Sequence, residues 1–114
     1  MNAFAKTRWI GYPVRKVRLV LDLIKGKDVE SALNILKFTP NYAARSVEKT
    51  LKSAVANLID KNRDANIDTN EVYISKMFAD EGPTMRRIKP RAQGRATKIR
   101  KRSSHLFVEV STKN

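Results

Sequence analysis

The stretch MRRIKPRAQGRATKIRKRSSH, residues 85–105, carries nine lysine or arginine residues and no acidic residue. Its larger apolar side chains, Met85, Ile88 and Ile99, stand singly, so they form neither a helical stripe nor a strand face that could be buried. The stretch supplies +9 of the formal charge of +13 and leaves 15 basic against 11 acidic residues for the rest of the chain. Because the positive charge is this local, we expect the stretch to bind a partner of dense negative charge.

Two segments rich in β-branched and aromatic residues flank the basic stretch. Residues 72–79, VYISKMFA, precede it, and residues 106–110, LFVEV, follow it. If they pair as antiparallel strands, the turn between them falls at Gln93 and Gly94. The pattern therefore predicts a long basic β-hairpin, whose tip lies roughly 30 to 40 Å from its base at about 3.3 Å per residue.

The N-terminal third predicts an edge strand followed by a helix. Residues 3–10 alternate loosely, with Ala3, Ala5, Thr7 and Trp9 on one face and Phe4, Lys6, Arg8 and Ile10 on the other. Pro13 fits the first turn of a helix, and Lys25 with Gly26 fits its end. Between them the apolar side chains recur at helical spacing: Val14, Val17, Val20, Leu21 and Ile24.

Two more amphipathic helices are predicted in the middle of the chain. Asp28 is a suitable N-cap for the first, and Thr39 or Asn41 for the second, which continues to about Asn62. Their apolar stripes are Val29, Ala32, Leu33 and Leu36, and then Ala44, Val47, Leu51, Ala54, Val55, Leu58 and Ile59. The polar residues 63–71 predict a surface loop.

A chain of 114 residues fits a single domain. We expect a globular body at residues 1–83 and 104–114 and an extended basic hairpin at residues 84–103. The sequence has no cysteine, which excludes disulfides and thiolate metal sites. No apolar run is longer than three residues, so we expect neither a transmembrane span nor a signal peptide, and no membrane partner.

A second basic group lies in the first turn and a half of the helix that follows Pro13. Arg15, Lys16 and Arg18 oppose the helix macrodipole at this end. They either form a solvated basic face or, together with the free N–H groups of the helix N-terminus, form a seat for a phosphate group.

Catalytic patterns are sparse. His105 is the only histidine. Asp80 and Glu81 are adjacent, so on a strand they point to opposite faces and cannot share a proton or a metal ion. The sequence lacks the common phosphate-loop, zinc-protease and serine-hydrolase motifs. We therefore expect no enzyme activity, no cofactor and no metal site.

Several segments identify a family. These are RKVRLVLDLIKGK at residues 15–27, LKSAVAN at 51–57, DEGPTMRR at 80–87, PRAQGRA at 90–96 and KRSSH at 101–105. In the same order, they closely resemble the bacterial large-subunit ribosomal protein twenty-two family, from about residue 5 to residue 110. The resemblance implies an α+β fold of three helices packed on a small three-stranded antiparallel sheet, with a long basic β-hairpin extension.

The resemblance also implies a function and a set of residues. The protein would be a structural component of the large ribosomal subunit in the cytoplasm, bound to ribosomal RNA and to neighbouring large-subunit proteins. Its hairpin would reach inward, and the tip would line the exit tunnel and meet the nascent polypeptide. The tunnel-tip residues are Met85, Arg86, Arg87, Pro90, Arg91, Ala92, Gln93, Gly94 and Arg95. The RNA-binding residues predicted from charge and resemblance together are Arg15, Lys16, Arg18, Arg86, Arg87, Lys89, Arg91, Gln93, Gly94, Arg95, Lys98, Arg100, Lys101, Arg102 and His105.

Two other classes use similar charges. An architectural DNA-binding protein with basic β-ribbon arms could place them in a minor groove, although such arms belong to dimers. A basic nuclease would need clustered carboxylates or a positioned histidine, which the sequence does not assemble. A basic domain without a defined partner does not explain why the charge is so local.

Overall fold

The computed structural model of the chain describes residues 2–62, 67, 69–82, 85–90, 96–101 and 103–112, and for Trp9, Thr69 and residues 85–90 and 96–101 it describes the backbone alone. In chain order the elements are β1 (Asn2–Ile10), α1 (Val14–Ile24), α2 (Val29–Phe38), α3 (Tyr42–Lys61), the 3-10 helix η2 (Thr69–Glu71), β2 (Val72–Glu81), β3 (Met85–Pro90), β4 (Ala96–Lys101) and β5 (Ser104–Thr112). No helix among the described residues is both long and apolar enough to cross a membrane.

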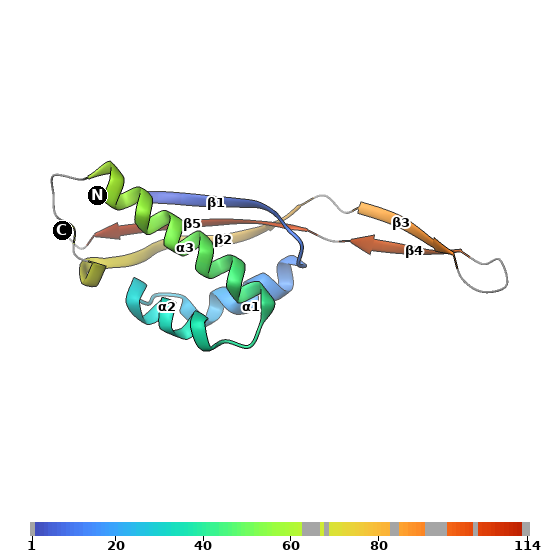
Figure 1. Cartoon of the computed structure of the whole chain (residues 1–114), viewed down its shortest axis with the longest axis horizontal. Coiled ribbons are helices and arrows are strands. Elements are labelled where there is room, and N and C mark those ends of the chain that lie inside the picture. The colour runs from blue at the N-terminus through green and yellow to red at the C-terminus, as the bar shows by residue number, and fades with distance from the viewer. Residues whose placement is uncertain are drawn as a thin grey trace.

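Three strands form an antiparallel sheet in the order β1-β5-β2, so β5 lies in the middle (Figure 1). The predicted pairing of β2 with β5 is confirmed, with Phe78 opposite Phe107 and Ala79 opposite Leu106. The predicted edge strand is also confirmed as β1, which pairs with β5 alone within the described sheet.

The predicted face of Ile10 is wrong. The register of β1 against β5 shifts between Thr7 and Ile10. An irregularity of this kind reverses the alternation of the residues that follow it. Ile10 is therefore buried, whereas Phe4 and Lys6 are exposed.

All three helices pack on one face of this sheet (Figure 1). Helix α1 buries the five residues that its spacing predicted. It begins at Val14, so Pro13 is its N-cap rather than its first residue. After α1, Gly26 takes a positive φ of 74°, a conformation that costs glycine little.

Helix α3 lies along the sheet and carries the centre of the core. Leu51 and Leu58 on α3 and Leu106 and Val108 on β5 are fully or almost fully buried. Of the two predicted caps, Asn41 is the one used, because its Oδ1 accepts a hydrogen bond from the N–H of Ala43 at 3.0 Å. These contacts confirm the α+β fold of three helices on a three-stranded antiparallel sheet.

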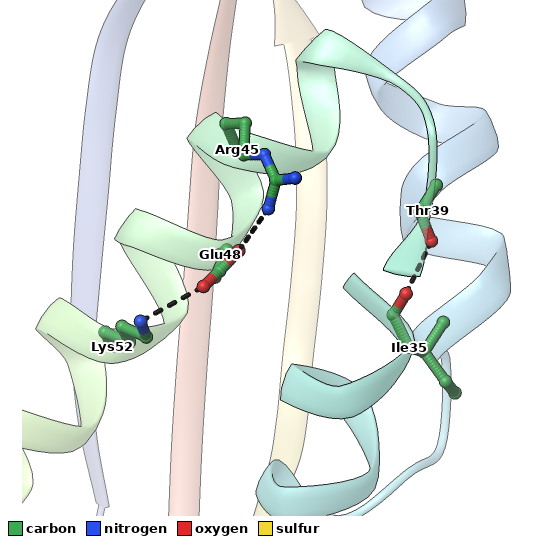
Figure 2. Close-up of polar contacts among 5 residues, drawn as sticks. All are labelled: Ile35, Thr39, Arg45, Glu48 and Lys52. Atoms are coloured by element: carbon green, nitrogen blue, oxygen red, sulfur yellow. Dashed lines mark hydrogen bonds and ion pairs between the residues drawn. The ribbon is translucent and has the colours of Figure 1, made fainter. Parts of the chain in front are cut away.

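Thr39 acts at the end of α2 instead. Its hydroxyl donates a hydrogen bond to the carbonyl oxygen of Ile35 at 2.6 Å (Figure 2). The bond satisfies a carbonyl group in the last turn of α2, and Pro40 follows directly.

Strands β3 and β4 pair antiparallel with each other, from Met85 opposite Lys101 to Pro90 opposite Ala96. This register centres on Gln93. The turn predicted at Gln93 and Gly94 lies outside the described residues, so the full hairpin and its reach stay predictions.

Candidate nucleic-acid interface

The N-terminus of α1 exposes two of the predicted RNA-binding cations. Arg15 and Lys16 are solvent-exposed, and the first turn of α1 contains no acidic residue. The N-cap residue, Pro13, provides no side-chain hydrogen bond to this helix end. Among the described residues, neither Arg15 nor Lys16 forms an ion pair. The positive end of the helix dipole and two uncompensated cations thus coincide at one place.

Arg18 lies one turn further along and has a different contact. Its Nε and Nη2 donate hydrogen bonds to the backbone oxygen of Ala79, at 3.2 and 3.0 Å. Ala79 lies near the end of β2, so Arg18 ties α1 to the strand that leads toward β3. Two of its five N–H groups are therefore used inside the body, and the other three form no hydrogen bond with a described residue.

Another predicted RNA-binding residue, His105, lies where β2 ends and β5 begins. It is half-buried and stands opposite Asp80 in the sheet. The N–H of Gly82 donates to the carbonyl oxygen of Ser103 at 2.9 Å. A Cβ atom on Gly82 would lie only 2.5 Å from the Ser103 hydroxyl and 3.3 Å from the His105 ring, so glycine permits this close approach.

A partly buried hydrogen bond joins this region to the start of α1. Ser104 is fully buried, and its hydroxyl donates to the carbonyl oxygen of Tyr12 at 3.0 Å. Tyr12 directly precedes the N-cap of α1. The start of α1 therefore lies at the end of the body from which β2 and β5 lead toward β3 and β4 (Figure 1). Arg15 and Lys16 belong to the first turn of α1, and His105 follows Ser104 on β5.

The other predicted site residues lie in or beside β3 and β4. The structure gives the backbone but not the side chains of Met85, Arg86, Arg87, Lys89, Pro90, Lys98, Arg100 and Lys101. Outside the described residues lie Arg91, Ala92, Gln93, Gly94, Arg95 and Arg102. The RNA-binding and tunnel-tip assignments of these residues stay predictions.

Cations on α3 are arranged differently from those on α1. Arg45 Nη1 lies 3.2 Å from one carboxylate oxygen of Glu48, and Lys52 Nζ lies 3.0 Å from the other (Figure 2). The hydrogen bond from Lys52, followed by the charges of Lys52 and Arg45, holds the pKa of Glu48 below its usual value. On this face of α3, two cations therefore share one carboxylate.

Sequence reasoning missed one surface. Phe4, Phe78 and Phe107 stack in a row on the face of the sheet that the helices leave uncovered. We call these three side chains the ring row. The alternation of residues 3–10 placed Phe4 and Lys6 on a common face, but nothing local to that strand predicted which rings would lie beside them.

Comparison with known proteins identifies the family. Residues 5–111 match the family described as Ribosomal protein L22p/L17e. The chain belongs to this family. Members of the L22p/L17e family are structural ribosomal proteins rather than enzymes. The resemblance noted from the sequence is thereby confirmed.

Two relatives within the L22p/L17e family cover almost the whole chain. The large ribosomal subunit protein uL22 of Ligilactobacillus salivarius (strain UCC118) is 50% identical over 112 residues, which is 98% of this chain and 95% of that protein. The protein of the same name from Clostridium novyi (strain NT) is 50% identical over 110 residues, 96% of each chain.

Proposed function

We propose that this chain is a structural component of the large ribosomal subunit and binds ribosomal RNA through the start of α1, the ends of β2 and β5, and the basic hairpin. The observation that carries the proposal is the Ser104–Tyr12 hydrogen bond, which joins the uncompensated cations of α1 to the end of the sheet that continues into the basic stretch. Membership of a ribosomal protein family and 50% identity to two uL22 proteins support it.

The finer part of the proposal concerns the hairpin. Residues 84–103 reach inward between RNA segments, and the tip lines the nascent-peptide exit tunnel and meets the nascent polypeptide. The stem supplies sequence-independent attraction to phosphate groups, since its lysines and arginines release counterions from RNA when they bind. The antiparallel pairing of β3 with β4 supports an extended ribbon of this kind.

Cell fractionation tests the proposal at the level of the partner. A tagged copy of the full chain should co-sediment with large ribosomal subunits and stay bound in moderate salt. Recovery of the tagged chain with the nucleoid instead would contradict the proposal and favour the architectural DNA-binding class.

The tunnel assignment needs its own test. Deleting Met85, Arg86 and Arg87 shortens one arm of the hairpin and shifts its register, while the body and most basic side chains remain. We expect the deletion variant to be incorporated into large subunits. Cells that carry it should grow differently from wild type on a macrolide antibiotic. Normal incorporation of the variant into subunits with an unchanged drug response would contradict the tunnel assignment. Exclusion of the variant from subunits would mean that the three residues anchor the protein.

A further inference from the structure

The ring row crosses all three strands of the sheet on its uncovered face. Phe107 of the central strand stacks on Phe4 of β1, with ring centroids 5.4 Å apart, and on Phe78 of β2, with centroids 4.9 Å apart. The ring planes are inclined by 23° and 17°, so both pairs are stacked with an offset. Phe4 is 54% exposed and Phe78 is 39% exposed. The ring row is therefore partly exposed to solvent.

Lysine side chains lie over the ring row. The Nζ atom of Lys6 is 5.6 Å from the centroid of Phe4 and 5.7 Å from that of Phe107, and the Nζ atom of Lys76 is 5.6 Å from that of Phe78. Arg8 is exposed further along β1.

Two carboxylates face the same side of the sheet. Glu109 stands opposite Phe4 and Lys76 in the sheet and accepts a hydrogen bond from the amide of Asn2 at 3.0 Å. Asp80 is exposed near His105. With Lys6, Arg8 and Lys76 against these two groups, the balance of charge on this face is positive.

A groove of about 440 Å³ runs beside the ring row. Its lining includes Phe78 and Phe107 of the ring row, together with Arg8, Asp80 and His105, one from each of the three strands. This volume is within the range of small-ligand sites, about 300 to 1,000 Å³. The groove therefore combines aromatic rings, cations and a carboxylate, that of Asp80, which can accept hydrogen bonds.

We propose that this groove binds an unpaired base of single-stranded RNA. The base packs against Phe78 and Phe107, Asp80 accepts a hydrogen bond from the base, and Lys6 and Arg8 contact the adjoining phosphates. Exposed sheet faces with aromatic side chains bind unpaired RNA bases in this manner in other folds. The inference rests on the RNA-binding function proposed above and names a second contact surface on the body.

The charges favour RNA over an apolar protein segment as the occupant. A ring row alone suits either partner, but cations held over the rings match phosphate groups and would be buried without compensation under an apolar segment. The groove also includes His105, at the end of the body from which β2 and β5 lead toward the basic stretch. One RNA could therefore run from the basic stretch onto the sheet.

The test compares two matched ring variants of the full-length chain. In the first, Phe78→Leu and Phe107→Leu remove the rings of the groove and keep apolar side chains. In the second, Phe38→Leu and Tyr42→Leu remove two aromatic residues, each 80% exposed, outside the groove. Fluorescence anisotropy measures the affinity of each for a short single-stranded oligoribonucleotide and for a duplex RNA, and circular dichroism verifies that both variants fold.

We expect the groove variant to bind the single strand about 5- to 100-fold more weakly than wild type, with duplex affinity unchanged, because bases inside a duplex cannot enter the groove. The second variant should bind both RNAs as wild type does. Lys6→Gln should reduce the slope of log affinity against log salt by about 0.7 for the single strand.

A photocrosslink provides a measurement that needs no substitution. An oligoribonucleotide that carries 4-thiouridine should crosslink to wild-type peptides that contain Phe78 or Phe107. Equal single-strand affinity of the two ring variants, or crosslinks confined to other peptides, would overturn the inference while the RNA-binding proposal stands. Failure of the wild-type chain to bind either RNA would overturn the RNA-binding proposal itself. Full RNA affinity of the groove variant together with its loss from subunits would mean that a protein covers this face, which also overturns the inference.

Discussion

Helices α1 and α3 both bury one face against the sheet and expose cations on the other, but the cations differ in their ion-pair partners. On α3, Arg45 and Lys52 share Glu48. On α1, Arg15 and Lys16 stand at the positive end of the helix dipole, and no described carboxylate pairs with them. The α3 cations stabilise their own helix, whereas the α1 cations act against theirs. We therefore expect RNA to contact the cations of α1 rather than those of α3, although both helices carry positive charge.

The largest effect is expected from a substitution on the buried face of α3, which we expect to stabilise the fold without contacting RNA. Leu51→Ala removes a fully buried side chain, so the free energy of unfolding should fall by about 2 to 5 kcal/mol. RNA affinity of the folded protein should stay within about twofold of wild type. Urea denaturation and anisotropy measure the two quantities, and the exposed Ser53→Ala is the control on the same helix. A large loss of RNA affinity with an intact fold would place RNA on α3.

The next prediction compares the cations directly. Arg15→Gln with Lys16→Gln, and Arg45→Gln with Lys52→Gln, lower the net charge equally. The α1 variant should reduce the salt slope of RNA binding by about 1.4, equivalent to about 25-fold in affinity at ~0.1 M salt, while the α3 variant changes it little. Stability of the α1 variant should equal or slightly exceed that of wild type, because the dipole clash is relieved. Equal losses of affinity in the two variants would mean that net charge alone drives binding.

Within α1, Arg18 should contribute to the stability of the fold, whereas Arg15 should not. Arg18→Gln loses its hydrogen bonds to Ala79, and we expect the free energy of unfolding to drop by about 1 kcal/mol, since the contact is partly exposed. Arg15→Gln should cause no such drop. Thermal or urea denaturation of the two single variants measures this difference. Equal stability of both variants would mean that the Arg18 contact contributes nothing to the fold.

The smallest effect concerns pH and Glu48. Its pKa in the folded protein is lowered by Lys52 and Arg45, so the ion pairs stabilise the protein above the usual glutamate pKa of 4.5 and stop doing so as the pH falls through the lowered value. Glu48→Gln should cost about 0.5 kcal/mol at neutral pH, because both cations are largely exposed. In acid, urea midpoints of variant and wild type should converge. A difference that persists in acid would point to packing rather than charge.

Local patterns predicted much of this fold and less of the site. The apolar spacing of α1 identified its buried residues, because helical periodicity needs only neighbouring positions. Pairing of β2 with β5 followed from the composition of the two segments. The face of Ile10 could not be predicted, because the shift arises from how β1 meets β5.

Contacts between distant residues were also beyond the sequence. The acceptor for Arg18 lies 61 positions away, so a cation predicted to meet phosphate also has a bond within the body. The ring row draws one residue from each of three strands, and only the order of the strands brings them together.

The central position of β5 affects the order of events during synthesis. Strands β1 and β2 both pair with β5 and not with each other, although β5 is the last of the described strands to leave the ribosome that makes the chain. A nascent chain that has emerged only as far as β4 holds two strands without the one that joins them. Helices can form early because their hydrogen bonds are local, but the sheet can form only after β5 has emerged. Until then the basic residues emerge ahead of a folded body, when nearby nucleic acid can reach them before the core has closed.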